Sequence, residues 1–119
     1  MNPAEFEKTL MERFPALRDE ILEDSGLEHL QCGTLSRYAE QQIEEKNWSE
    51  VKRIFGFLEE AEHGGDSAVE NAIVVSFLEY FDFGEDEQHV RALMGETLVG
   101  LYEEQMRYME DLKRRSEET

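Results

Sequence analysis

Cysteine is nearly absent: Cys32 is the only one among 119 residues, which excludes an internal disulfide. The sequence also lacks a basic segment followed by an apolar one near its start, so no signal peptide is visible. No apolar run approaches the length of a membrane span. We therefore expect a cytoplasmic protein with no membrane partner. The length favours a single domain over residues 1–119, with residues 116–119 frayed.

The motifs of common catalytic sites are missing as well. The sequence has no HExxH, no CxxC and no nucleophile elbow, and Gly64-Gly65 lacks the strand and lysine of a phosphate-binding loop. Glu60 and His63 have the E-x-x-H spacing of di-iron bundles. Such a site needs a second E-x-x-H, and Asp86 and His89 match that pattern only weakly. We therefore expect a protein that is not an enzyme and holds no metal or cofactor. An enzyme or metal carrier that uses His63 is an alternative.

Lysine and arginine are absent between Arg53 and Arg91, an interval that holds ten of the 29 acidic residues. The formal net charge of −17 repels bare nucleic acid and anionic membranes and favours a basic protein as partner. Aromatic side chains among the acids would add anchoring area. The predicted partner-binding residues form two clusters: Glu59, Glu60, Glu62 and Asp66, and then Glu79, Tyr80, Asp82, Glu85, Asp86 and Glu87. Alternatively, Phe81 and Phe83 belong to the core and the acids form a solvated turn.

The most apolar stretch, SAVENAIVVSFLEYFDF over residues 67–83, predicts a central buried helix. At 100° per residue its apolar side chains cover most of the circumference, which is typical of a helix buried on most sides. Ser67 and Glu70 have the spacing of a capping box, and Gly84 is a natural stop.

The rest of the chain also has helical periodicity and no alternating strand pattern, so we predict an all-α bundle of five to six helices. Asn2, Pro3 and Glu5 open the first helix, and Pro15 starts a second short one that ends at Ser25-Gly26. The further predicted helices cover residues 35–46, capped by Thr34, residues 50–63, capped by Ser49 and ended by Gly64-Gly65, and residues 87–112. Gly95 and Gly100 leave open whether the last helix is continuous.

Several segments resemble a group of small, all-helical bacterial proteins. They are Phe57-Leu-Glu-Glu60, Gly64-Gly65-Asp66, Ser76-Phe-Leu-Glu79 and the later LMGETLVGLYEEQ, so the resemblance spans roughly residues 34–105. Some members of this group resemble immunity proteins of polymorphic toxin systems. The resemblance implies a cytoplasmic protein that binds and neutralises a cognate toxin, but no functional residue is carried over with it.

Two functional hypotheses follow. In the first, the chain is an immunity protein whose acidic interval faces a toxin with a basic surface, such as an enzyme acting on nucleic acid or nucleotides. In the second, it is an acidic adaptor or regulatory protein that binds a cellular protein through its C-terminal helix, using Tyr102, Met106 and Met109. The oligomeric state stays open.

Overall fold

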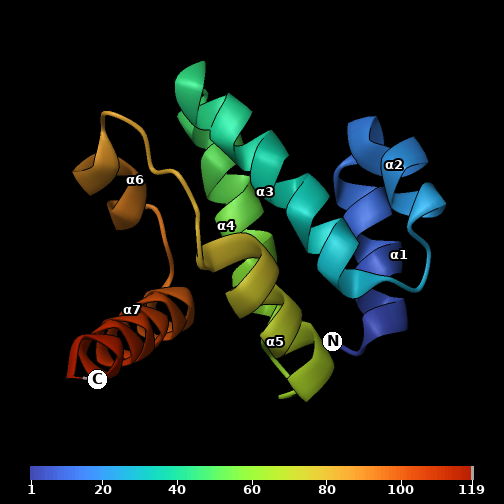
Figure 1. The fold of residues 1–119 in the computed structure, drawn as a ribbon. Helices are drawn as coiled ribbons and strands as arrows, with labels where there is room; N and C mark the ends of the chain where they lie inside the picture. Colours follow the sequence, from blue (N-terminus) through green and yellow to red (C-terminus); the bar gives the residue numbers. More distant parts are fainter. Residues whose placement is uncertain (119) are drawn as a thin grey trace.

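The computed structural model describes residues 1–118, which form helices and no strands, as the periodicity predicted (Figure 1). The elements are α1 (Pro3–Arg13), the 3-10 turn η1 (Pro15–Leu17), α2 (Arg18–Glu23), α3 (Glu28–Glu44), α4 (Trp48–Ala61), α5 (Ser67–Ile73), the π-helical η2 (Val74–Leu78), α6 (Glu87–Ala92) and α7 (Glu96–Glu118). The all-α bundle is therefore confirmed.

A continuous core connects these elements. α3 packs against α4, α5 and η2, and two groups of aromatic rings pack within the fold. One group contains the pairs Phe6–Phe57 and Phe57–Phe14, and the other contains Phe55–Phe77, Phe77–Phe81, Phe81–Phe83 and Phe83–Tyr102, with ring centroids 4.9–6.4 Å apart. Such ring pairs stabilise a core beyond the area that they bury.

The first turn of the chain matches its prediction in detail. Asn2 Oδ1 accepts a hydrogen bond from the Glu5 backbone N–H at 2.8 Å, and the Glu5 carboxylate accepts from the Asn2 N–H at 3.4 Å. Pro15 then opens η1, which continues into α2. Both signals are local, because every atom involved lies within a few residues of the others.

The central helix is shorter than predicted. It covers α5 and η2, and the chain beyond η2 leaves the helix, so that residues 81–84 are extended loop. Phe81 and Phe83 are both buried while Asp82 is exposed, an alternation that an extended segment gives and a helix does not. The predicted capping by Ser67 is also wrong: the cap is Asp66, whose Oδ1 accepts from the N–H groups of Ala68 and Val69 at 3.0 Å each.

Two further predicted caps are wrong. α3 begins at Glu28 rather than after Thr34, which is buried inside the helix. The reason is tertiary: Gln31 is buried in the first turns of α3, where it donates to Glu7 of α1 at 2.7 Å and so draws this segment into the helix. α4 begins at Trp48, and the Ser49 hydroxyl donates to the Asn47 side chain at 3.2 Å instead of capping the helix.

The predicted last helix is broken into α6 and α7 at residues 93–95. The Glu59 carboxylate of α4 accepts hydrogen bonds from the N–H groups of Thr97 and Leu98, at 2.8 and 2.9 Å, and so caps α7 from another helix. A Cβ on Gly95 would lie 2.6 Å from Glu59 Cδ, so only glycine admits this approach. α7 continues to Glu118, and residue 119 lies outside the described residues, so the predicted fraying of residues 116–119 stays a prediction.

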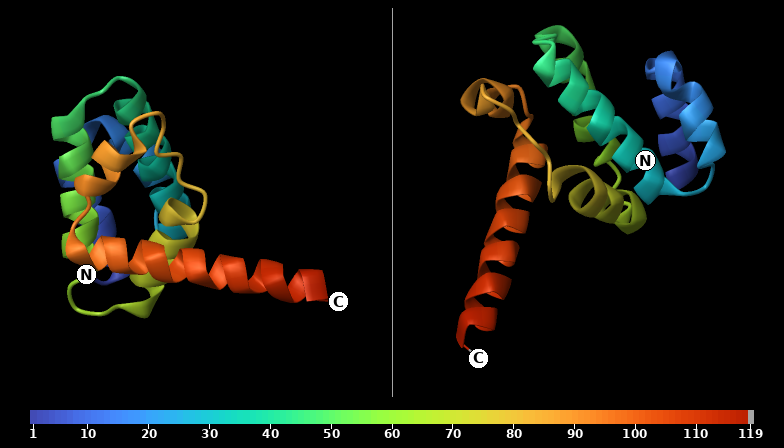
Figure 2. Two further views of the ribbon diagram at one scale, coloured as in Figure 1. Left: turned by 90° about the vertical axis from the view of Figure 1, so that its left-hand side faces the viewer. Right: turned by 45° about the horizontal axis from the view of Figure 1, so that its top comes forward.

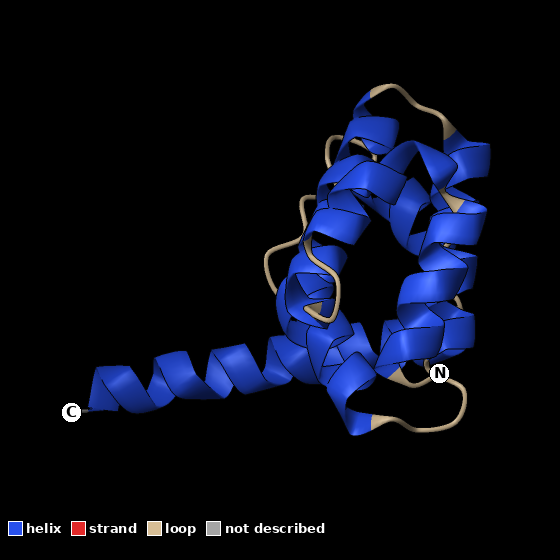
Figure 3. Cartoon of the chain, turned by 90° about the vertical axis from the view of Figure 1, so that its right-hand side faces the viewer, coloured by secondary structure: helices blue, strands red, loops and turns tan. Residues whose placement is uncertain are grey.

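α7 also leaves the body of the molecule. Its N-terminal turns contact α4 and η2, while its C-terminal half projects away from all other helices (Figures 2 and 3).

Candidate protein-binding surface

The first acidic cluster consists of Glu59, Glu60, Glu62 and Asp66, and three of these four residues make contacts within the fold. Glu59 caps α7 and Asp66 caps α5. Glu60 forms an ion pair with Arg13 at 2.5 Å. Burial raises the pKa of Glu59, but the hydrogen bonds from Leu98 and Thr97 outweigh it and leave the pKa below its usual value. The carboxylates of Glu59, Glu60 and Asp66 therefore already make contacts within the protein, as helix caps or in an ion pair.

Glu62 differs from its neighbours. Its Oε1 atom is buried and accepts no hydrogen bond from residues 1–118. Burial is the main cause that raises the pKa of Glu62 to about 7, helped by the charges of Glu70 and Glu59 and opposed by the amino group of Met1. That amino group donates to the carbonyl oxygens of Ala61, at 3.1 Å, and His63, at 2.6 Å. The charged amino group of Met1 is thus hydrogen-bonded to the C-terminal end of α4, close to the Glu62 carboxyl group.

The second cluster contributes to a groove. The segment from Asp82 to Asp86 lies beside the C-terminal half of α3, and the two enclose a concavity of about 570 Å³. We call it the acidic groove; its charged lining consists of Glu40, Glu44, Asp82, Glu85 and Asp86 against Arg37 and Lys46. Its net charge is negative and its carboxylates come from two segments about forty residues apart in the chain.

Hydrogen bonds hold the rim of the acidic groove in place. The Glu40 carboxylate accepts from the Asp82 backbone N–H at 2.8 Å, and Asp82 Oδ1 accepts from the Gly84 N–H at 2.9 Å. Lys46 approaches Asp86 only to 3.9 Å in an exposed position, where an ion pair contributes little. Glu44 and Glu85 are exposed to solvent at the same groove.

The other predicted residues of the second cluster do not line this groove. Tyr80 is 81% exposed, and Glu87 lies exposed in the first turn of α6. Glu79 lines a different groove, between η2 and α7. Phe81 and Phe83 are buried, as the core alternative held. The structure thus brings together Asp82, Glu85 and Asp86, and adds Glu40 and Glu44, which the sequence did not single out.

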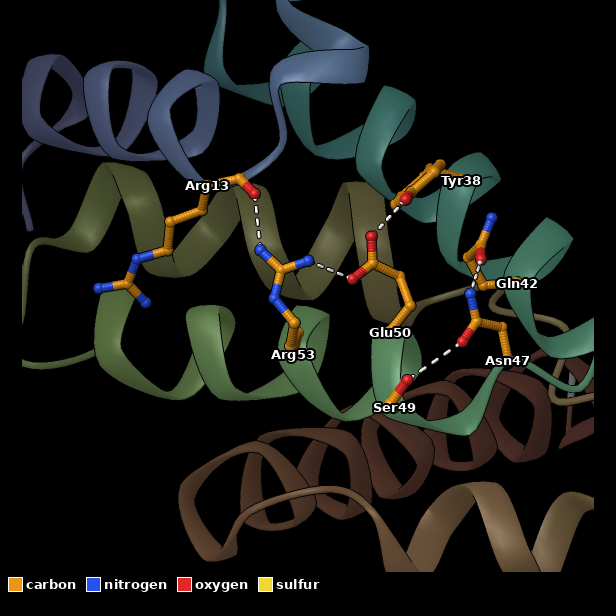
Figure 4. A network of polar contacts seen from close by, with 7 residues as sticks. All are labelled: Arg13, Tyr38, Gln42, Asn47, Ser49, Glu50 and Arg53. Carbon is orange, nitrogen blue, oxygen red and sulfur yellow. Dashed lines mark hydrogen bonds and ion pairs between the residues drawn. The ribbon is translucent and has the colours of Figure 1, made fainter.

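A polar network at the other side of α3 joins α1, α3 and α4 (Figure 4). Glu50 accepts from the Tyr38 hydroxyl and from Arg53, which also donates to the Arg13 carbonyl oxygen at 2.7 Å. Burial and the hydrogen bond to Glu50 raise the pKa of Tyr38 to about 12. Asn47 donates to Gln42 at 2.8 Å. The network occupies its basic groups internally, so it offers structure rather than a binding site.

His29 and Ser76 form a contact that resembles a nucleophile and its base, with Nδ1 2.7 Å from Oγ. The other ring nitrogen faces Asn71 at 3.5 Å rather than a carboxylate. Ser76 lies within η2, where backbone N–H groups serve the helix instead of an oxyanion. The contact ties α3 to η2.

Cys32 is buried, and burial, with the charge of Glu28, raises the pKa of its thiol to about 12.

Within residues 1–118, no three His, Cys, Asp or Glu side chains gather as metal ligands, so His63 has no such site. None of the helices there is both long and apolar enough to cross a membrane. The chain belongs to the family DUF7674, described as a domain of unknown function, whose profile matches residues 7–110. No curated protein and no solved structure matches the chain.

Proposed function

We propose that this member of DUF7674 is a cytoplasmic protein-binding domain, not an enzyme, that holds a basic protein in its acidic groove. The observation that carries the proposal is the concentration of five carboxylates on that groove against two cations, one of which makes a long, exposed ion pair. A neutralised toxin is the partner that fits best, because covering a basic catalytic surface inhibits an enzyme that acts on nucleic acid or nucleotides. Nucleic acid itself is disfavoured by the charge of −17.

The physical consequence of this surface is fast, salt-sensitive association. Exposed charges of one sign steer an oppositely charged partner and raise its association rate, and added salt screens that attraction. Tyr80 lies at the edge of the same segment, where an exposed aromatic ring offers anchoring area to the bound partner. Hydrogen bonds at Glu40 and Asp82 keep the backbone of the rim fixed, which lowers the entropic cost of binding.

The experiment reverses charges whose structural role is small: the long, exposed pair of Asp86 with Lys46 is the ion pair that it removes. Glu44, Glu85 and Asp86 are each replaced by Lys, which leaves the hydrogen bonds of Glu40 and Asp82 in place. We expect the association rate with the partner to fall by about tenfold or more at low salt and to lose most of its salt dependence. The partner's activity should no longer be inhibited at equal concentration.

The matched control makes the same change in net charge elsewhere. Glu12, Asp19 and Glu23 are exposed on α1 and α2, which lie across the molecule from α6 (Figure 1). None of the three lines the acidic groove, and each is replaced by Lys. The control should retain inhibition and most of the association rate. If both triple variants lose the same amount, overall charge rather than the acidic groove binds the partner, and the assignment fails.

The second candidate is an adaptor that binds through the C-terminal helix, and the projection of α7 favours it (Figure 2). Tyr102 does not belong to its free surface, because its ring packs against Phe83 at 5.2 Å and lies under the Arg91 guanidinium. Met106 and Met109 remain. Replacement of both by Glu should abolish binding to an adaptor target and leave binding through the acidic groove intact.

A further inference from the structure

The C-terminal half of α7 has no support from the body of the protein. The side chains of α7 that pack against the core end at Tyr102, and residues 103–118 continue as a helix into solvent (Figures 2 and 3). An isolated helix of this length is marginal in water, and most helices are stabilised by packing of an apolar face. The projecting half therefore needs a surface to pack on.

The sequence of α7 carries such a face along its whole length. Leu98, Leu101, Gln105, Tyr108 and Leu112 follow one another at alternating spacings of three and four residues, the pattern of helices that pair side by side. Leu98 is fully buried in the core, whereas Tyr108 is 58% and Leu112 43% exposed. One continuous strip is thus covered at its base and uncovered along the projection.

A groove of about 920 Å³ lies where this strip leaves the core. On one side it is lined by Leu101, Glu104, Gln105 and Tyr108 of α7, and on the other by α5 and η2 with Glu70, Val75 and Glu79. Its charged lining residues are all acidic, Glu70, Glu79 and Glu104, and Val75 is 43% exposed. An occupant with apolar side chains and positive charge fits this groove.

α7 itself carries such a segment near its C-terminal end, before Glu117 and Glu118. Leu112 is followed by Lys113, Arg114 and Arg115, a quarter of the 12 basic residues of the sequence. All three are exposed, and the ion pairs within residues 1–118 are made by Arg13, Lys46 and Arg53 instead. The basic segment of one molecule and the α5–α7 groove of another, whose charged lining residues are acidic, are therefore complementary in charge and in apolar character.

We propose that α7 pairs antiparallel with α7 of a second copy of this chain, with the basic tip of each copy in the α5–α7 groove of the other. A two-fold axis near Met109 places Arg115 of one helix beside Glu104 of the other, and Tyr108 over Leu112. Glu104 and Arg115 of one chain are about 16 Å apart along the helix, so they meet only between copies. Gln105, a polar residue within the strip, would fix this register. The inference does not depend on the proposed function.

The test measures self-association of the full chain by sedimentation equilibrium. About 0.15 M salt screens the repulsion between two chains of charge −17 beyond some 8 Å. We expect a reversible dimer whose dissociation constant rises about fivefold or more in Glu104→Lys and in Arg115→Glu, since each change places like charges together twice. The double variant, with the charges exchanged, should recover most of the wild-type affinity.

Matched controls lie one residue away on the other face of the helix. Glu103→Lys and Arg114→Glu make the same charge changes at neighbouring positions and should alter the dissociation constant less than about twofold. Circular dichroism checks that helix content is kept. A chain that stays monomeric at all concentrations overturns the proposal, and so does a double variant no tighter than either single one. Leu112→Glu, which removes the apolar contact, should give a monomer.

Discussion

Replacement of Glu59 by Ala is the perturbation that most directly probes how α7 is held. The Glu59 carboxylate caps α7 through the N–H groups of Thr97 and Leu98, and it closes over Gly95. Without it, two N–H groups at the start of α7 lose a charged acceptor, and the helix N-terminus loses a favourable negative charge.

The magnitude follows from these contacts. Loss of an N-cap costs about 0.5–2 kcal/mol, and hydrogen bonds to a charged group contribute about 1.5–3 kcal/mol. Because water replaces part of this at a half-buried site, we expect the free energy of unfolding to fall by about 2–3 kcal/mol. With an unfolding entropy of about 2.1 cal/mol/K per residue over 119 residues, the melting temperature should fall by about 8–12 °C.

The assay is urea unfolding at neutral pH followed by circular dichroism, with Glu60→Ala as control. Glu60 is the next residue of α4 and makes only an exposed ion pair with Arg13, so its loss should cost less than about 1 kcal/mol. Gly95→Ala adds a second test. Alone it should destabilise by about 1–3 kcal/mol, because the new Cβ forces the Glu59 carboxylate out of place.

In a chain that already carries Glu59→Ala, the same glycine replacement should cost much less, because the space has been vacated. The two effects should therefore fall short of additivity by about 1–2 kcal/mol. Additive effects, or a Glu59→Ala variant as stable as Glu60→Ala, would refute the account of how α4 caps α7.

The remaining predictions concern the buried titratable groups. Glu62 binds its proton more tightly in the folded than in the unfolded chain, because its pKa is raised. The free energy of unfolding of the wild type, measured relative to that of Glu62→Gln, should therefore fall as the pH rises from about 4.5 through 7. We expect a fall of about 1–2 kcal/mol, since water screens this half-buried site. Urea unfolding of both proteins at pH 5 and pH 8 measures this, and equal pH profiles would contradict it. Cys32 should react with a thiol reagent at pH 8 about a thousandfold more slowly in folded than in urea-unfolded protein; rapid labelling of the folded chain would show that the thiol is not buried.

Local signals in the sequence predicted local structure well. The capping box at Asn2 and Glu5 forms as expected because its partners lie within one turn. At α5 the predicted cap was one residue off, since Asp66 and Ser67 are adjacent candidates and only the backbone decides between them. Thr34 shows the limit: a good cap residue is drawn inside α3 by a buried contact to α1 that no local pattern reveals.

The break in the last helix had a cause that lies far away in the chain. The apolar period runs through residues 87–112 without interruption, and Glu59, 38 residues before Thr97, caps α7 and so sets where the second helix begins. Gly95 was the visible signal, but its meaning depends on which side chain approaches it. Propensity alone therefore could not distinguish a weak helix from two helices.

The sequence predicted that the candidate site is acidic, but it did not predict which acidic residues line it. An interval without Lys or Arg is visible in the sequence, whereas the division of its acids into capping groups and groove residues depends on long-range partners. Glu40 and Glu44 carried no signal of their own, because only the packing of α3 beside residues 82–86 makes them part of the acidic groove.

The measurement that tests the central claim most directly is co-purification from the native cells, with the neighbouring gene products present. The wild-type chain, the Glu44, Glu85 and Asp86 reversal and its α1–α2 control are compared, each with the same quantity of bait. We expect one basic protein, stoichiometric with the wild type and the control and lost from the groove variant, whose expression alone harms cells and whose effect this chain prevents. A partner retained equally by all three chains, or no basic partner at all, would contradict the assignment of the acidic groove as the functional surface.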